Sequence, residues 1–161
     1  MNMEERQILR GDGTWPWSAF VDGDDIVVLG ARATCFGGSR DPQDSGETAS
    51  GISTRLNPGL RACALPMIYT GKNRSLLKAL GGSPIPKVPW KTMVAVTCGK
   101  ITHKFPVIDL GPAKRTGNAI DLTVPAARLY DAKATATRFE MICDYRIIGG
   151  AKFLARKGTV Q

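Results

Sequence analysis

Short apolar runs, separated by glycine- and proline-rich turns, are the feature that most limits how this chain can fold. The 161 residues include 18 Gly and 10 Pro, and most apolar runs between them have the length of β-strands, about four to eight residues. Only residues 73–80 and 125–130 start like helices. Many short strands and few helices predict a mainly β fold, a closed barrel or a sandwich. We expect strands at Ser18–Val21, Ile26–Leu29, Ala31–Phe36, within Leu60–Tyr69, and at Thr92–Cys98, Ile101–Ile108, Ala119–Leu122, Phe139–Asp144 and Tyr145–Ile148.

The first residues lack a periodic pattern. Gly11–Trp17 combines chain breakers with aromatic rings, so residues 1–17 are expected to cover part of the fold rather than to form an element. The turn signal Asp22–Asp25 follows and predicts a hairpin. The N-terminus shows no apolar signal-peptide core, and no apolar run approaches the roughly 18 residues of a membrane span.

Positive charge is concentrated in the second part of the chain. Residues 1–53 hold four basic and nine acidic residues, whereas residues 54–161 hold eighteen basic and five acidic ones, and the net charge is +8. Such a basic body suggests an anionic partner, a cell-wall polymer, a membrane surface or nucleic acid, although solubility alone is an alternative. A nucleic-acid partner is not favoured, because the chain lacks a basic helix, a zinc pattern and an aromatic-basic RNA motif.

The cysteine and histidine content excludes common metal motifs. Cys35, Cys63, Cys98 and Cys143 include no C-x-x-C pair, so neither a zinc knuckle nor a redox motif is expected. Disulfides and buried thiols both remain possible readings of these four residues. His103 is the only histidine and alternates with apolar neighbours, which favours a strand position. We expect no metal and no cofactor.

Two carboxylates stand out in the segment 105–123. Asp109 and Asp121 each follow an apolar run, and a Gly/Pro-rich loop separates them. Burial against Ile108, Ile120 and Leu122 would raise a carboxyl pKa and suit a general acid. The alternative is that each carboxylate caps a loop by accepting backbone N–H bonds. The many surrounding cations would tend to lower both pKa values, so an acid at Asp121 needs strong desolvation or coupling to Asp109.

The order of several short motifs resembles double-psi β-barrel domains. Asp109–Pro112 and Ala119–Thr123 are similar to the paired Asp motifs of rare-lipoprotein-A-like proteins and of the barrel of membrane-bound lytic transglycosylase A. Thr48–Gly51, Ala31–Gly38 and Pro125–Arg128 resemble the accompanying loop, strand and helix. Expansins and family 45 glycoside hydrolases are more distantly similar. The resemblance covers about residues 29–148.

The resemblance implies an architecture. It predicts a six-stranded double-psi β-barrel with short helices and an N-terminal extension. Residues 1–25 would form the extension and the start of a hairpin, and residues 26–150 the barrel. A segment near 68–90 would be inserted into the barrel, and residues 151–161 would form a loosely held basic tail.

It also implies roles for individual residues. Asp121 would be the acid/base, and Asp109 would hold the site or stabilise positive charge on the sugar. Thr48, Ser50, Lys114 and Asn118 are candidate hydrogen-bond donors to a glycan, with loop capping as their alternative. Phe36 and Trp90 are candidate platforms for sugar rings.

Two departures narrow the mechanism. The family's histidine after the Ala-Ser-Gly loop is replaced by Ala62, and no acid follows the first barrel strand until Asp41. An inverting hydrolase needs a second carboxylate as base, whereas a lytic transglycosylase can work with one carboxyl group. The resemblance therefore implies cleavage of peptidoglycan strands with a single Asp.

The alternative is a non-catalytic barrel. It would be an expansin-like wall-binding module or a structural part of a phage tail. The expected partner in either case is peptidoglycan or another polysaccharide, with other virion or cell-wall proteins as further partners. The setting would be extracytoplasmic, at the cell wall, or a phage virion.

Overall fold

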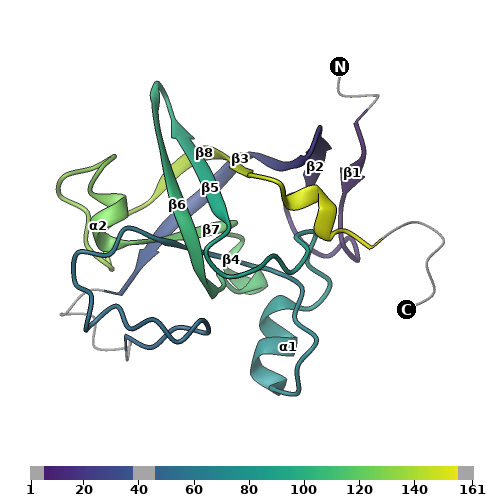
Figure 1. Ribbon diagram of the computed structural model, residues 1–161, viewed down its shortest axis with the longest axis horizontal. Helices are drawn as coiled ribbons and strands as arrows, with labels where there is room; N and C mark the ends of the chain where they lie inside the picture. The colour runs from purple at the N-terminus through teal and green to yellow at the C-terminus, as the bar shows by residue number, and fades with distance from the viewer. Residues whose placement is uncertain (1–5, 38–45, 156–161) are drawn as a thin grey trace.

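The protein is described by a computed structural model that covers residues 6–37 and 46–155. Most of its elements are strands (Figure 1). These strands are β1 (Ile8–Leu9), β2 (Ala19–Asp22), β3 (Asp25–Phe36), β4 (Cys63–Leu65), β5 (Met93–Cys98), β6 (Ile101–Leu110), β7 (Ile120–Thr123) and β8 (Met141–Ile147). The helices are α1 (Arg74–Leu80) and α2 (Val124–Ala127), with single 3₁₀ turns η2 (Lys114–Thr116) and η3 (Gly150–Phe153).

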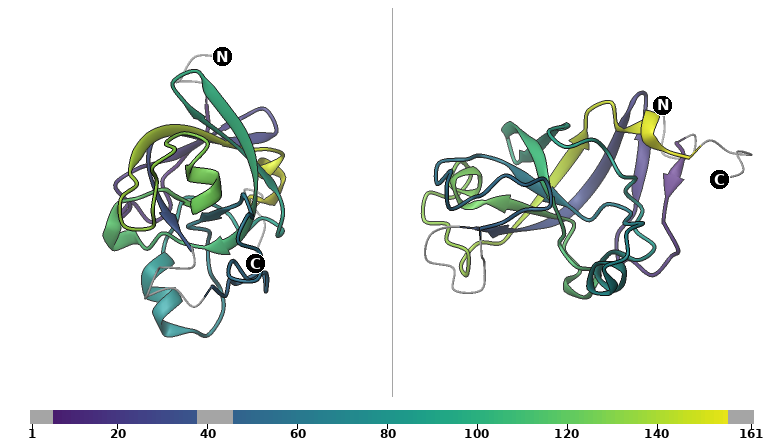
Figure 2. Two further views of the ribbon diagram at one scale, coloured as in Figure 1. Left: turned by 90° about the vertical axis from the view of Figure 1, so that its left-hand side faces the viewer. Right: turned by 60° about the horizontal axis from the view of Figure 1, so that its bottom comes forward.

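Six of the strands close into a barrel. Their order is β3-β7-β4-β6-β5-β8, and β8 pairs with β3 to complete the ring, which is seen end-on in the left view of Figure 2. The pairs β3–β7 and β4–β6 are parallel and the others are antiparallel. β2 and β1 extend the sheet from β3. The mainly β fold with a closed six-stranded barrel and short helices is therefore confirmed.

The barrel consists of two topologically equivalent halves. If β3, β4 and β5 are exchanged with β6, β7 and β8, every barrel pairing maps either onto another pairing of the same direction or, for β4–β7 and β5–β8, onto itself. The antiparallel pair β4–β7 lies between the halves and maps onto itself. Positions in β4 and β7 are thus directly comparable.

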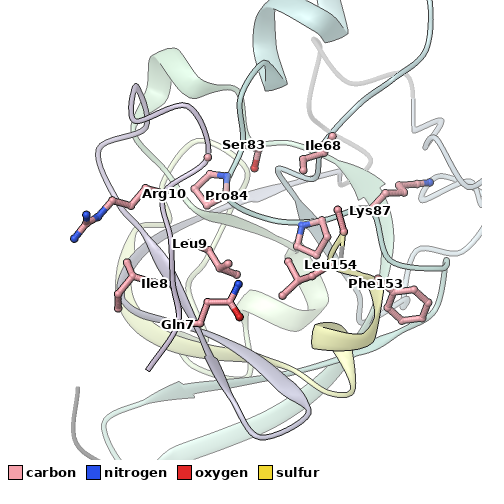
Figure 3. Close-up of a pocket in the computed structure, with 13 residues that line it drawn as sticks. Gln7, Ile8, Leu9, Arg10, Ile68, Ser83, Pro84, Lys87, Phe153 and Leu154 are labelled. Atoms are coloured by element: carbon pink, nitrogen blue, oxygen red, sulfur yellow. The ribbon is translucent and has the colours of Figure 1, made fainter. Parts of the chain in front are cut away.

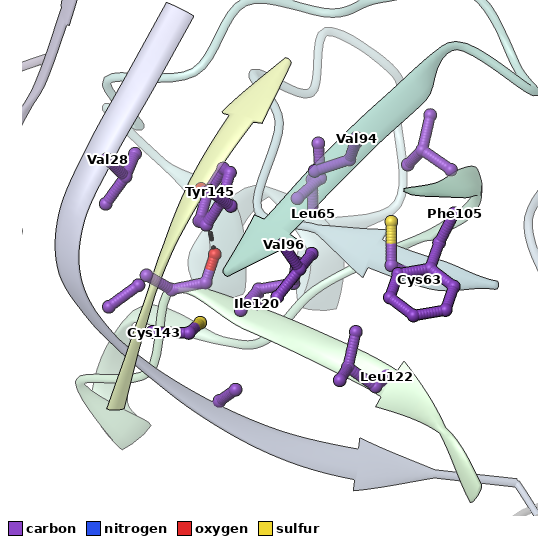
Figure 4. Packing of buried hydrophobic residues seen from close by; sticks show 14 of the residues in the cluster. Val28, Cys63, Leu65, Val94, Val96, Phe105, Ile120, Leu122, Cys143 and Tyr145 are labelled. Atoms are coloured by element: carbon purple, nitrogen blue, oxygen red, sulfur yellow. Dashed lines mark hydrogen bonds between the residues drawn. The ribbon is translucent and has the colours of Figure 1, made fainter. Parts of the chain in front are cut away.

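The period-two pattern of the strands fills the barrel interior. Val94, Val96, Phe105 and Ile120 are at most 1% exposed, and Figure 4 shows their side chains converging from different strands. The buried Tyr145 joins them and donates its hydroxyl to the Ala119 carbonyl at 3.0 Å. The polar atom of this large ring is satisfied, so the ring can be buried without an unpaired donor.

Local signals place the hairpin and the first helix as predicted. Asp22 and Asp25 close the β2–β3 hairpin, and both carboxylates bind the guanidinium of Arg146 on β8. Asn73 caps α1 by accepting the N–H groups of Ser75 and Leu76, which offsets part of the unpaired first turn. Cysteine does not add cross-links, because all four cysteine side chains are thiols.

The structure corrects two expectations and extends a third. The closing segment is one continuous strand, β8, rather than two, because its residues pair without interruption with β5. The N-terminal segment forms the short strand β1, which pairs with β2. β6 runs on to Leu110 and includes Asp109.

Parts of the predicted N-terminal extension, first loop and C-terminal tail fall outside the described ranges. Residues 1–5, 38–45 (with Asp41) and 156–161 belong to them. Among the described residues, no helix has the length and apolar character needed to cross a membrane.

Candidate functional site

The two predicted carboxylates lie in one row across four strands. Asp121 on β7 is the register partner of Thr34 on β3 and of Ala64 on β4. Ala64 in turn is the partner of Asp109 on β6. The row therefore reads Thr34, Asp121, Ala64, Asp109. With neighbouring strands about 4.8 Å apart, the Cα atoms of the two aspartates are about 9–10 Å apart.

Thr34 and Asp121 of this row lie on the outer wall of the barrel. Ala33 and Cys35 on β3 and Ile120 and Leu122 on β7 are buried in the core. Since side chains alternate along a strand, Thr34 and Asp121 point the other way. The sequence suggested that Ile120 and Leu122 cover Asp121, but their side chains point into the core instead.

The covering of Asp121 comes from β3 and from the loop before β7. Thr34 donates its hydroxyl hydrogen to Oδ1 of Asp121, and Asn118 Nδ2 donates to Thr34 Oγ1 at 3.4 Å. A Cβ on Gly111 would lie 4.0 Å from the other carboxylate oxygen. Asn118 is 9% exposed, and its Oδ1 has no hydrogen-bond partner among the described residues.

Burial makes Asp121 a weak acid. The pKa of Asp121 is raised to about 6, chiefly by desolvation; the hydrogen bond from Thr34 lowers it, and the nearby charge of Asp109 adds to the rise. No cation of the described residues is among the causes of this shift, and desolvation and coupling to Asp109 are the two effects that an acid at Asp121 was expected to need. A carboxyl group with such a pKa can both donate and accept a proton near neutral pH.

Asp109 has different partners. Its Oδ1 accepts the backbone N–H groups of Ala49 and Leu110, each at 2.9 Å. The N–H of Ser50 donates to the Ile108 carbonyl at 3.1 Å, which fastens the same loop to β6. Asp109 thus acts as an anchor for the loop around residue 49, the capping alternative raised by the sequence.

The hydroxyls predicted to bind a glycan are engaged within that loop. Thr48 Oγ1 and Ser50 Oγ lie 2.9 Å apart. Thr48 Oγ1 also donates to the Ile52 carbonyl at 2.7 Å. The loop is therefore internally fastened and lies beside the end of β6.

The other predicted binding residues are spread around the site. Lys114 is turned toward the N-terminal segment, where its Nζ donates to Thr14 Oγ1 at 3.0 Å. Phe36 ends β3, two residues beyond Thr34 on the same strand. Trp90 is held beside β6, because the N–H of Lys91 donates to the Val107 carbonyl at 2.8 Å. Its ring carries the ammonium of Lys87 at 4.1 Å.

Thr34 is the site residue that sequence reasoning missed. The alternation of Ala33, Thr34 and Cys35 indicates that Thr34 points away from the core. Its partner depends on the register of the parallel pair β3–β7, which joins residues 87 positions apart. A polar residue on the outer face of the first barrel strand was the available signal.

Comparison with known proteins adds no family. No protein-family model matches the chain, and no curated protein matches it in sequence. Within residues 6–37 and 46–155, no three His, Cys, Asp or Glu side chains are grouped so that they could hold a metal ion. The geometry of the row is thus the basis for any functional assignment.

Proposed function

We propose that this protein is a double-psi β-barrel of the rare-lipoprotein-A-like kind that cleaves peptidoglycan strands as a lytic transglycosylase. The two parallel pairs, β3–β7 and β4–β6, and the exchange symmetry of the halves support the barrel assignment. The observation that carries the activity is the covered carboxyl of Asp121, whose pKa is raised to about 6. The basic chain, with its net charge of +8, suits an anionic wall polymer.

Asp121 performs both proton transfers in this proposal. The protonated carboxyl gives its proton to the glycosidic oxygen, and the C1–O bond breaks. The resulting carboxylate then takes the proton of the sugar's own 6-hydroxyl while O6 bonds to C1. The product is a 1,6-anhydro sugar, no water is consumed, and Asp121 ends protonated again. One carboxyl group is enough, so this mechanism does not need a second carboxylate directly after the first barrel strand, where the sequence has none until Asp41.

The second candidate is a non-catalytic wall-binding or virion barrel. It is favoured by the partners of Asp109, which include the backbone N–H of Ala49 in the neighbouring loop and that of Leu110 at the end of β6. Thr48 and Ser50 are similarly occupied by each other. In this alternative the row serves to hold loops on the barrel wall.

Digestion of purified sacculi separates the two candidates. The proposal expects soluble anhydro-muropeptides, identified by mass spectrometry, from wild type and none from Asp121→Asn. Asp24→Asn is the matched control, because Asp24 is an exposed residue of the β2–β3 turn. Equal binding of wild type and Asp121→Asn to sacculi with no soluble product would establish the non-catalytic alternative.

A further inference from the structure

An open groove lies at the other end of β3 from the carboxylates. Its volume is about 540 Å³, within the range of about 300–1,000 Å³ typical of binding sites. Leu9 of β1 lies on one side, and Pro84 and Leu154 lie across from it (Figure 3). Pro86 also lines the groove. Along β3, the register position beside β2 and the one beside Asp121 differ by seven residues, which is roughly 20 Å. The β1 groove is therefore separate from the proposed site.

Among the described residues, no strand pairs with the outer edge of β1. The N–H of Val21 donates to the Gln7 carbonyl at 2.9 Å, so Gln7 and Val21 form a hydrogen-bonded pair. The next pair, Ile8 and Phe20, is then a non-hydrogen-bonded pair. The N–H and C=O of Ile8 consequently point away from β2. Unpaired backbone groups on a sheet edge are a template for an incoming strand.

The opposite wall of the groove has no free backbone N–H at residues 84–86 that could pair with this edge. Pro84 and Pro86 have no backbone N–H to offer. Between them, Ile85 uses its N–H on the Ser83 hydroxyl and its C=O on the N–H of Ile68. Residues 84–86 thus offer no free backbone N–H to the C=O of Ile8.

The charges of the groove select the chemistry of that chain. Arg10 and Lys87 line it and are exposed, and none of the thirteen described residues that line it is acidic. Asp12, just beyond Arg10, is held by the hydroxyl and N–H of Thr14. We propose that the β1 groove binds an extended acidic segment of a partner protein, which adds to β1 as a further antiparallel or parallel strand. Its small apolar side chains face Leu9, and its carboxylates meet Arg10 and Lys87.

A labelled peptide of alternating character tests this docking site. The probe is N-acetyl-Glu-Val-Glu-Val-Glu amide, with the Lys-Val-Lys-Val-Lys peptide as its control, and binding is followed by fluorescence anisotropy. We expect saturable binding of the acidic peptide only, which weakens as salt increases. In the wild-type ¹⁵N spectrum, the amides of residues 7–11 should shift, with that of Ile8 protected from exchange.

Two variants remove the two kinds of contact separately. Ile8→Pro deletes the outward N–H at a strand edge, where proline is tolerated, and should weaken binding at least tenfold while β1–β2 amide signals persist. The double variant Arg10→Glu, Lys87→Glu should weaken it similarly, whereas the remote Lys133→Glu should not. Unchanged affinity in both groove variants, or shifts confined to amides outside the groove, would overturn the proposal. So would self-association of wild type that Ile8→Pro abolishes, since the occupant would then be a second copy.

Discussion

Asp121 and Asp109 occupy one row of the barrel wall but differ in what surrounds their carboxylates. Asp109 accepts two backbone N–H groups, donors that stabilise a negative charge. Asp121 accepts one hydroxyl and is otherwise desolvated, so that its pKa is raised to about 6. Two aspartates that look alike in sequence are thus a loop anchor and a desolvated carboxyl group with a raised pKa.

The exchange symmetry of the barrel sharpens this contrast. Because the halves map onto each other, Asp121 on β7 is equivalent to Ala64 on β4, and Thr34 is equivalent to Asp109. One half therefore places the carboxyl group of Asp121 next to Thr34, where the other half places the methyl group of Ala64 next to Asp109. The chemistry of the site arises from a local difference in side chains on a repeated backbone frame.

Replacing Asp121 should have the largest effect. Asp121→Asn keeps an acceptor for Thr34 but cannot exchange a proton, so release of anhydro-muropeptides should fall by about 100-fold or more. The rate is measured as soluble product from sacculi per unit time. A rate within threefold of wild type would remove Asp121 from the chemistry.

Replacing Asp109 should mainly affect stability. Asp109→Ala leaves the N–H of Ala49 without its acceptor, and the loss of charge-assisted hydrogen bonds should cost about 2 kcal/mol of unfolding free energy. Urea denaturation followed by tryptophan fluorescence measures it. An unchanged denaturation midpoint would show that Asp109 is not an anchor.

The raised pKa of Asp121 should also make the stability of the fold depend on pH. Since the folded pKa of Asp121 is about 6 and lies above the ordinary value of 3.8, its contribution is fully present below about pH 3.8 and is lost as pH rises toward 6. Asp121→Asn should remove this loss. The difference in unfolding free energy, variant minus wild type, should therefore be about 1–3 kcal/mol more positive at pH 7 than at pH 4. Parallel urea titrations at both pH values provide the comparison, and a constant difference between the proteins would contradict it.

A smaller effect is expected from Thr34. Its hydroxyl lowers the pKa of Asp121, so Thr34→Val should raise that pKa further and move the high-pH limb of the activity profile to higher pH. The lost hydrogen bond should destabilise the fold by about 1 kcal/mol. Thr14→Val is a useful control, because Thr14 bonds Asp12 and Lys114 instead. An unchanged pH profile would show that Thr34 does not influence the pKa of Asp121.

Much of the fold follows from local signals in the sequence. The Asp22–Asp25 turn, the Asn73 cap and the alternation of β5 and β6 each depend on residues close in sequence. The placement of both aspartates next to apolar strands was likewise visible. These features are set by turn chemistry and by period two, which a single sequence carries.

The surroundings of the individual residues of the row could not be predicted from the sequence. The pKa of Asp121 depends on the parallel register with β3 and on the loop before β7, both long-range. Lys114 belongs to that same loop, but its charge is used on Thr14 in the N-terminal segment. Local sequence does not specify which distant segment will form hydrogen bonds with a given side chain. A count of charges along the chain therefore does not show which charges lie near Asp121.

A titration of Asp121 is the most direct test of whether its carboxyl group is desolvated and has a raised pKa. Its ¹³C carboxyl signal can be assigned by comparing wild type with Asp121→Asn and then followed as a function of pH. The account predicts a midpoint of about 6, because the carboxyl is desolvated and lies near Asp109. A midpoint near 4, the ordinary value for an aspartate, would show that Asp121 is solvated and would contradict its role as a proton donor near neutral pH.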